Sequence, residues 1–438
     1  MTGRRIAAAA GVVAVLGAAA LADLLRGGPD GSVAALEARV LGETIATYER
    51  RLREDPGNPV VSARLVSDHM AAFQLDNDLA HLRRAVALSE ALVPVALDPG
   101  AAHARVAAAR LSLHDFRGAL AAARAAVTAD SNGAAALGTL YDAAIAAGSY
   151  AEAARTLERL RSSHPGTLAT TLREARWLEA NGEPREALAR FEPVCRRLPE
   201  RAVRRQLVAW CQTIAGGFAG AAGHAGAEAA WYQRALDTHP GYLPALEGQA
   251  ELAYRRSDWE RAEALYRRIL TDAHPDLYLR LAEVVRARGD DEEAAALEER
   301  LLALASTPEG RALQAHELAL LLARRPGRLD EALAVIERNV AARRSAESLE
   351  VLAWVRLVRG DLTDALAASI EARMHGAPGP TSDYTLARIF AGMGREADAG
   401  PLLERALADS TSLAPHARWD AARRRVERND AGSGRSPR

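Results

Sequence analysis

A repeat with a period near 34 residues constrains the fold of this chain more than any other feature of its sequence. An alanine, in most cases preceded by an acidic residue, recurs nine times, and six of the eight intervals measure 32–34 residues. A period of this length is the signature of stacked supersecondary units that bury their apolar faces only against one another. The 438 residues are therefore expected to form a repeat array. The alanines are Ala119, Ala153, Ala187, Ala229, Ala262, Ala294, Ala332, Ala365 and Ala399.

Two further marks keep register with the alanine and predict what each unit looks like. A glycine stands five residues before it in six units, where one helix must stop and reverse into the next with a left-handed backbone. A proline closes several units twelve or thirteen residues after the alanine, where it cannot continue a helix. The alanine itself falls one turn into the second helix, so we expect two backbones to cross closely there. The six glycines are Gly148, Gly182, Gly289, Gly327, Gly360 and Gly394.

Composition agrees with helices and excludes several classes of function. Aromatic residues make up only 5% of the chain while alanine is abundant, which favours helices over sheets. The 56 basic and 57 acidic residues nearly balance, which argues against a nucleic-acid partner held by a basic surface. The basic residues are all arginine, so lysine chemistry, including the P-loop, is excluded.

These marks resemble those of the tetratricopeptide repeat family. The unit from Leu168 to Arg201 carries the family's small residues at Ala175 and Ala187 and its closing proline at Pro199, and the unit from Leu243 to His274 fits similarly. The resemblance implies an all-α fold, a right-handed α-solenoid of about ten tetratricopeptide-type helix-turn-helix repeats. It also implies a concave groove that binds a partner protein or peptide, and says almost nothing about activity.

The pattern divides the chain into six parts. They are a signal peptide or membrane anchor at 1–28, an N-terminal helix at 33–58, the N-terminal part of the array at 59–201, an irregular repeat with a glycine-rich insertion at 202–242, the C-terminal part of the array at 243–413, and a basic tail at 414–438.

Two of these parts depart from the repeat. The stretch Gly216–Gly223 looks too rich in glycine for a regular helix, so we expect an elongated turn between the two helices of the fifth unit. Residues 417–438 hold seven arginines against three acids and finish in Gly-Ser-Gly-Arg-Ser-Pro-Arg. We expect a disordered tail there, and an electrostatic tether to something acidic is the alternative.

The first residues have the layout of a secretory signal. Arg4 and Arg5 precede seventeen uncharged residues, and small residues at Ala20 and Ala22 stand before Asp23. We therefore expect a periplasmic or secreted protein. An uncleaved anchor in the inner membrane and a helical leader of a cytosolic protein are the alternatives.

No motif for catalysis, a cofactor or a metal emerges. His316-Glu317 begins a zinc-protease pattern, but the second ligand position holds Leu320. If the chain reverses at residues 199–201, Cys211 lies roughly 10 Å along its helix from the level of Cys195, at about 1.5 Å per residue. A disulfide needs Cα atoms within about 7 Å. This geometry favours two buried thiols, with a bond as the alternative.

The candidate binding surface is therefore the concave face. First-helix positions that point into the groove in this family carry charged and large aromatic side chains in the later units, as binding hot spots do. Three glutamates among them make the middle of the groove mildly acidic, which hints at a partner segment with arginine or lysine. The candidate partner-binding residues are Arg176, Glu247, Glu251, Tyr254, Glu283, Arg286, Glu350, Trp354, Tyr384 and Arg388.

The leading hypothesis is an exported, non-enzymatic scaffold or adaptor that binds protein partners in its groove, without a cofactor or nucleic acid. A membrane-anchored assembly factor or chaperone is the second hypothesis. A small-molecule or hydrolytic pocket near the glycine-rich insertion is the third. This third hypothesis requires a closed cavity lined by convergent polar groups.

Overall fold

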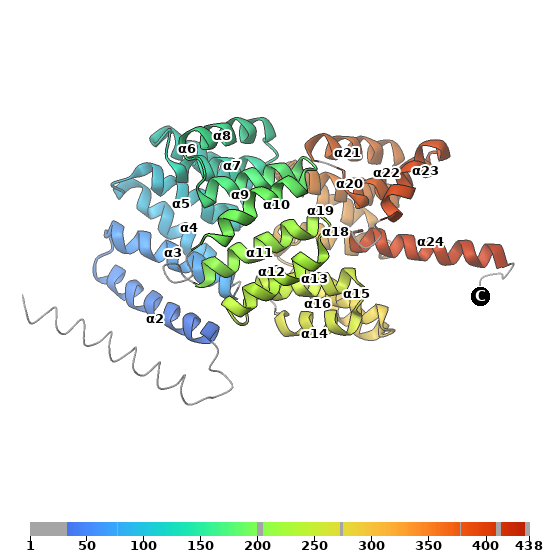
Figure 1. Ribbon diagram of the computed structural model, residues 1–438, viewed down its shortest axis with the longest axis horizontal. Helices are drawn as coiled ribbons and strands as arrows, with labels where there is room; N and C mark the ends of the chain where they lie inside the picture. The colour runs from blue at the N-terminus through green and yellow to red at the C-terminus, as the bar shows by residue number, and fades with distance from the viewer. Residues whose placement is uncertain are drawn as a thin grey trace, which may run out of the picture.

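The computed structural model describes residues 33–76, 78–198, 205–271, 275–376, 378–408 and 413–433. In these ranges every regular element is a helix, and consecutive helices pair into ten hairpins (Figure 1). The pairs are α3 Pro59–Asp76 with α4 Leu79–Leu92, α5 Pro99–Ser112 with α6 Phe116–Ala129, α7 Ala134–Ala146 with α8 Tyr150–Ser163, α9 Leu168–Ala180 with α10 Pro184–Arg196, α11 Arg205–Ala221 with α12 Ala225–Thr238, α13 Leu243–Arg255 with α14 Trp259–Ile269, α15 Asp276–Ala287 with α16 Asp291–Leu304, α18 Ala315–Ala323 with α19 Leu329–Ala342, α20 Ala346–Arg359 with α21 Leu362–His375, and α22 Pro380–Gly392 with α23 Glu396–Ala408.

Four elements lie outside this pairing. Helix α2 precedes the first hairpin, a 3-10 turn follows α4, a short helix leads into α18, and α24 ends the described chain. Their bounds are Val33–Glu54 for α2, Val93–Val95 for η1, Pro308–Leu313 for α17 and Pro415–Ser433 for α24. The all-α solenoid predicted from the repeat is confirmed.

The turn between the two helices of a hairpin lies at the glycine in the six units where the sequence places one. All six glycines have left-handed backbones, with φ between 73° and 94°. In two units without a glycine, His114 (φ 59°) and Ser257 (φ 58°) take the same conformation five residues before the alanine. The turn geometry thus belongs to the repeat itself, and glycine is the residue that adopts it with the least strain.

The alanines of the repeat lie where paired helices cross. Eight of the nine retain at most 4% of their surface. A methyl group is the only side chain that fits such a close approach, so these positions set the spacing of the hairpins. The eight are Ala119, Ala153, Ala187, Ala262, Ala294, Ala332, Ala365 and Ala399.

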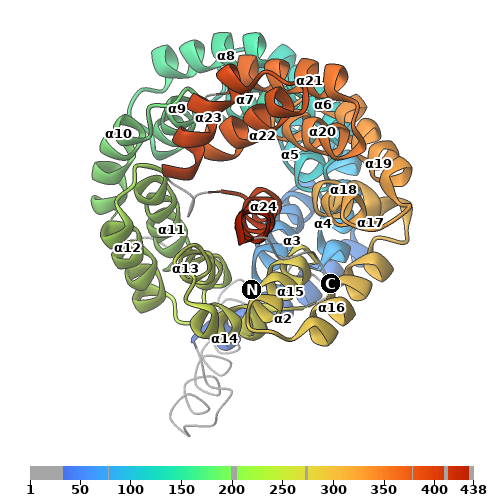
Figure 2. The same cartoon turned by 90° about the vertical axis from the view of Figure 1, so that its right-hand side faces the viewer.

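The hairpins wind into a superhelix whose later hairpins contact the earlier ones. In Figure 2 the first helices α11, α13 and α15 lie nearer the middle than their partners α12, α14 and α16. After one turn of the superhelix, α8 contacts α20 and α21. The backbone N–H of Ala346 in α20 donates to the hydroxyl of Tyr150 in α8 at 3.0 Å. The Tyr150 ring also stacks on His375 with centroids 4.8 Å apart.

The glycine-rich stretch is helical, so the expected elongated turn at Gly216–Gly223 is wrong. Helix α11 runs through it to Ala221, and the turn begins only at Ala222. The reason is packing from α12. A Cβ at Gly216 would lie 2.6 Å from the Tyr232 ring, and one at Gly220 would lie 2.7 Å from the Glu228 carboxyl group. Helix α11 can accept these large side chains because it offers bare backbone.

In the fifth unit the predicted position of the repeat alanine is wrong by one residue. Ala229 is half-buried, whereas Glu228 is only 2% exposed and follows the left-handed Gly223 by five residues. Glu228 therefore occupies the position that alanine holds elsewhere, and its carboxylate forms an ion pair with Arg255 of α13. The register marked by Ala229 was off by one residue.

The expectation of a disordered tail is also wrong for most of residues 414–438. Helix α24 covers Pro415–Ser433; it begins within the ring of hairpins seen in Figure 2 and extends beyond the hairpins in Figure 1. Leu413 and Ala417 are buried against Trp354 and Tyr384. This apolar contact is not visible in the composition of the tail, which is dominated by arginine.

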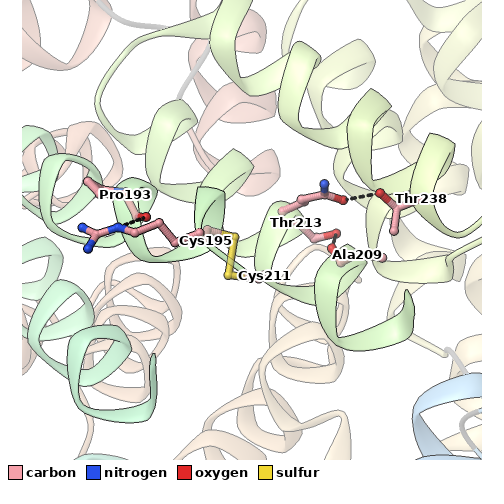
Figure 3. Close-up of a disulfide and its surroundings, with 8 residues drawn as sticks. Pro193, Cys195, Ala209, Cys211, Thr213 and Thr238 are labelled. Carbon is pink, nitrogen blue, oxygen red and sulfur yellow. Dashed lines mark hydrogen bonds between the residues drawn. A yellow bond between two sulfur atoms is a disulfide. The ribbon is translucent and has the colours of Figure 1, made fainter. Parts of the chain in front are cut away.

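Cys195 and Cys211 form a disulfide, with their Cα atoms 5.7 Å apart (Figure 3). The expected offset of about 10 Å was wrong because it assumed a tight reversal directly after α10. Helix α10 ends at Arg196 and α11 begins at Arg205, so packing between the two helices sets their register.

The leader at 1–28 lies outside the described residues. Within the described ranges, none of the helices combines the length and the apolar character that crossing a bilayer demands.

Candidate binding site inside the superhelix

A cavity of about 790 Å³ opens on the inner side of the superhelix. Consecutive first helices contribute its walls, because each hairpin turns the same face inward. Glu247 and Glu251 come from α13, Asp276 and Arg280 from α15, and Glu317 from α18. Helix α20 adds Glu347 and Glu350, and residues at the start of α24 complete the lining.

Acidic groups outnumber basic ones in this cavity. Six carboxylates line it, against the guanidinium groups of Arg280 and Arg324. Both arginines already have acidic partners. Arg280 lies 3.8 Å from the carboxylate of Glu251, and Arg324 lies 2.6 Å from that of Glu283. The cavity therefore carries negative charge that its own arginines do not balance.

Tyrosine hydroxyl groups hold Glu251 of the cavity lining and the neighbouring Glu283. The Tyr254 hydroxyl donates to Glu283 at 2.9 Å, and the Tyr266 hydroxyl donates to Glu251 at 3.1 Å. Both rings are almost fully buried. These two carboxylates are thus held in place within the wall, which leaves the others as the groups available to a ligand.

Burial favours the neutral form of Glu247, Glu317 and Glu350. Burial raises the pKa of Glu247 to about 7, with Asp276 and Glu251 adding like charge. Burial and then the charge of Asp276 raise the pKa of Glu317 as well. The pKa of Glu350 is likewise raised by burial. A cationic group entering the cavity would relieve this repulsion.

Helix α24 covers one side of the cavity. His416 is 7% exposed and its ring lies 4.7 Å from that of Trp354. The Arg418 guanidinium donates to the Tyr254 carbonyl oxygen at 3.2 Å and lies over the Tyr254 ring. Asp420 accepts from the Tyr384 hydroxyl at 2.8 Å. The start of α24 thus bridges α13, α20 and α22 across the interior of the superhelix.

Three of the predicted partner-binding residues line the cavity. Glu247 and Glu251 of α13 share this lining with Glu350 of α20. Glu283, the third glutamate of the predicted acidic middle, is not part of the lining.

Four other candidates are not exposed as expected. Tyr254, Trp354 and Tyr384 retain 4%, 4% and 1% of their surface, and Arg388 forms an ion pair with Asp420. They do lie on inner helices, but α24 packs over them. The expectation of exposed aromatic side chains was wrong because the segment expected to be a disordered tail covers them.

The remaining candidates lie away from the cavity lining. Glu283 is held by Arg324 and Tyr254. Arg286 binds Glu298 of its own hairpin at 2.8 Å. Arg176 is exposed on α9, with its nearest carboxylate, that of Glu179, at 3.8 Å.

Sequence reasoning missed Asp276, Arg280, Glu317 and His416. Asp276, Arg280 and Glu283 follow at helical spacing along α15, so an accurate start for that helix would have placed the first two beside Glu283. Glu317 was considered only as part of a metal motif. His416 carried no signal, because its place depends on how α24 returns into the superhelix.

The carboxylates are spread over several helices. Among the described residues no group of three or more histidine, cysteine or acidic side chains is arranged to hold a metal ion. The cavity thus differs from a compact cation site, in which several oxygen ligands meet at one point.

The tetratricopeptide repeat profile matches residues 277–312, which cover most of α15 and α16 and enter α17. The matched segment contains the left-handed Gly289 and the buried Ala294 described above. Residues 277–312 therefore form a tetratricopeptide repeat within this array of helical hairpins. Tetratricopeptide repeats generally serve as non-catalytic scaffolds for protein partners. None of the curated proteins matches the sequence.

Several solved structures are similar to this chain in fold. The human IFIT1 dimer with PPP-AAAA is 13% identical over 73% of each chain, with a TM-score of 0.45. Cut9–Hcn1 of the APC/C is 12% identical over 87% of this chain and 93% of that one, with a TM-score of 0.40. PilW, a type IV pilus biogenesis factor, is 16% identical over 49% of this chain and 97% of its own, with a TM-score of 0.37. Likeness at this level concerns the fold alone.

Proposed function

We propose that this protein is a non-catalytic scaffold that holds a segment of a partner protein inside its superhelix. The observation that carries the proposal is the cavity between α13, α15, α18 and α20, into which charged side chains from four hairpins converge. Repeat arrays present an extended inner surface of this kind, and charged groups facing a partner supply specificity. An adaptor role follows from such a surface without any chemical step.

We further propose that the protein works in the cell envelope after export. The leader pattern at residues 1–28 supports export. The Cys195–Cys211 disulfide supports it independently, because disulfides persist in oxidising compartments. A retained leader would instead make the protein a membrane-anchored assembly factor or chaperone.

Mass spectrometry of the protein purified from its own cells tests the export proposal. A mature N-terminus near Asp23 is expected, together with no free thiol at Cys195 or Cys211 without reduction. An intact leader in the membrane fraction would indicate the anchored alternative. Full-length protein in the cytosol with two free thiols would contradict both.

Site-specific photo-crosslinking in the native organism tests the scaffold proposal. A crosslinker at Glu347, whose side chain is 78% exposed at the cavity, should join the protein to a partner. A crosslinker at Met374 of the outer helix α21, with 77% of its surface exposed, is the matched control. Equal adducts at both positions, or none at Glu347, would contradict binding inside the superhelix.

A small-molecule receptor is the second candidate function. The cavity volume of about 790 Å³ falls within the usual range for small-molecule sites, and convergent polar groups line it. Tyr232, which packs on the glycine-rich part of α11, also lines it, so the cavity lies near the glycine-rich stretch. Native mass spectrometry of the purified protein would detect a retained small molecule as a fixed mass increment that denaturation removes.

A further inference from the structure

Four carboxylates in the cavity have no ion pair among the described residues. They are those of Glu247, Asp276, Glu317 and Glu350. The arginines in the same wall are engaged with Glu251 and Glu283. All four residues are half-buried, and a partly desolvated carboxyl group is costly to ionise without a cation nearby, so their presence indicates a position where positive charge is supplied from outside.

A second observation at the same cavity also points to a ligand. His416 is 7% exposed and lines the cavity, yet its Nδ1 has no hydrogen-bond partner in the described structure. The same is true of the buried Oε2 of Glu350. Buried polar atoms in native proteins are nearly always hydrogen-bonded. These two atoms can accept hydrogen bonds from the N–H groups of a bound molecule.

Unpartnered donors beside these groups define the ligand further. Nη1 of Arg280 and Nε of Arg324 are buried without a hydrogen-bond acceptor among the described residues, and both arginines line the cavity. A ligand that satisfies the whole wall must therefore carry oxygen acceptors as well as positive charge. A peptide segment offers both, through its carbonyl groups and a basic side chain. A simple polyamine lacks the acceptors.

We propose that the cavity binds an arginine or lysine side chain of a partner polypeptide, with backbone carbonyl groups of the same segment on Arg280 and Arg324. The positive group lies among Glu247, Asp276 and Glu317, and His416 of α24 closes the site. A guanidinium or ammonium group on a flexible stem reaches carboxylates that are too widely spread for one metal ion. This inference rests on the proposed scaffold function and names the chemistry of its partner.

The test measures binding of the peptide acetyl-Ala-Arg-Ala-Arg-Ala-amide to the full-length protein by calorimetry. Binding is expected, and the peptide with citrulline in place of arginine should bind at least about tenfold more weakly, because citrulline keeps the shape of arginine and removes its charge. Equal binding of the two peptides would overturn the proposal.

A pair of double variants locates the binding. Glu247→Gln with Glu317→Gln removes two cavity charges and should weaken arginine-peptide binding at least about tenfold. Glu260→Gln with Glu292→Gln makes the same charge change at exposed positions on the outer helices α14 and α16, and should change binding less than about twofold. Equal losses in both double variants would show that the peptide binds by net charge alone and would overturn the proposal.

A third arm separates a peptide from a small polycation. Spermidine carries positive charge without carbonyl groups, so it should bind more weakly than the arginine peptide and compete with it. Tighter binding of spermidine would overturn the assignment of a polypeptide ligand. Crosslinking at Glu347 without affinity for the arginine peptide would overturn this inference alone. Affinity without crosslinking would count against the scaffold.

Discussion

At the scale of single residues, the fold depends on side chains that are small enough to let helices cross. Ala294 is fully buried where α15 and α16 meet, while the next residue, Ala295, is exposed. The two alanines are identical in helix propensity and differ in what surrounds them. Interiors are close-packed, so added volume at Ala294 must displace a neighbouring helix.

Ala294→Leu should therefore lower the free energy of unfolding by roughly 1–3 kcal/mol. Ala295→Leu adds the same atoms toward solvent and should change it by less than about 0.5 kcal/mol. Denaturant titration followed by circular dichroism measures both. Equal midpoints for the two variants would contradict the placement of Ala294 at a helix crossing, and with it the register of the repeat.

His416 links stability to pH. Burial, followed by the charges of Arg324 and Arg280, lowers its pKa from 6.5 to about 3, so the folded protein keeps it neutral. Between these values the unfolded chain binds a proton that the folded chain does not, so stability falls as the pH falls. From pH 7 to pH 5 this single group contributes a loss of about 2 kcal/mol.

Replacing His416 with glutamine should remove that contribution. The difference in unfolding free energy between pH 7 and pH 5 is expected to be about 2 kcal/mol smaller in His416→Gln than in the unmodified protein. Other buried groups, including His316, titrate in both proteins and cancel in the comparison. An unchanged pH dependence would mean that His416 is not held neutral.

At the scale of elements, α24 behaves as a part of the core although it lies beyond the last hairpin. Asp420 joins it to α22, where it accepts from Tyr384 and pairs with Arg388. Asp420 and Arg388 retain only 7% and 15% of their side-chain surface. Removing one member of such a buried pair takes away the charge that compensates the other, which costs several times more than losing a surface ion pair.

Asp420→Ala should release α24 from the interior. With a cost of about 3 kcal/mol, amide hydrogens in residues 413–425 are expected to exchange roughly a hundredfold faster. Arg425→Ala changes an exposed residue of the same helix and should leave exchange nearly unchanged. Unaltered protection in Asp420→Ala would show that apolar contacts alone hold α24.

At the scale of the whole molecule, the superhelix is closed by contact between successive turns. Tyr150 receives a hydrogen bond from Ala346, which lies 196 residues further along the chain, and stacks on His375. The Arg343 guanidinium lies 5.0 Å from the centroid of the Phe116 ring. These contacts fix the curvature of the array and with it the distance across the cavity.

Gly148 offers a direct test of this closure. It has φ 77°, and a Cβ there would lie 2.5 Å from the Arg344 carbonyl oxygen on the next turn. Gly148→Ala should therefore open the turn and enlarge the radius of gyration measured by small-angle X-ray scattering. Gly289→Ala meets nothing within 4 Å at a similar φ of 93°.

Comparing Gly148→Ala with Gly289→Ala separates the cost of backbone strain from the effect of the contact with the next turn. Both variants are expected to lose about 1 kcal/mol of stability to the left-handed backbone, and only Gly148→Ala should change the dimensions of the molecule. An unchanged radius in Gly148→Ala would show that the turns are held at a fixed distance by other contacts.

The repeat register was predictable from sequence because it depends on local backbone chemistry. Left-handed turns need glycine or a residue that tolerates positive φ, and the crossing of paired helices needs alanine, so both leave marks at a fixed spacing. In the fifth unit the errors occurred where side chains of the paired helix change the environment of a residue. Glu228 replaced alanine because Gly220 stands opposite it, and Gly216 stayed helical because Tyr232 packs on it.

The sequence by itself thus determined the hairpins, their number and their order, because each depends on contacts within about 34 residues. Only the tertiary structure decided which carboxylates share a cavity, that Cys195 reaches Cys211, and that α24 returns to cover Trp354 and Tyr384. The cavity and the place of α24 depend on the curvature accumulated over many hairpins, whereas the disulfide depends on the packing of α10 against α11. Small rotations between neighbouring repeats add up to that curvature, and no single unit of the sequence records their sum.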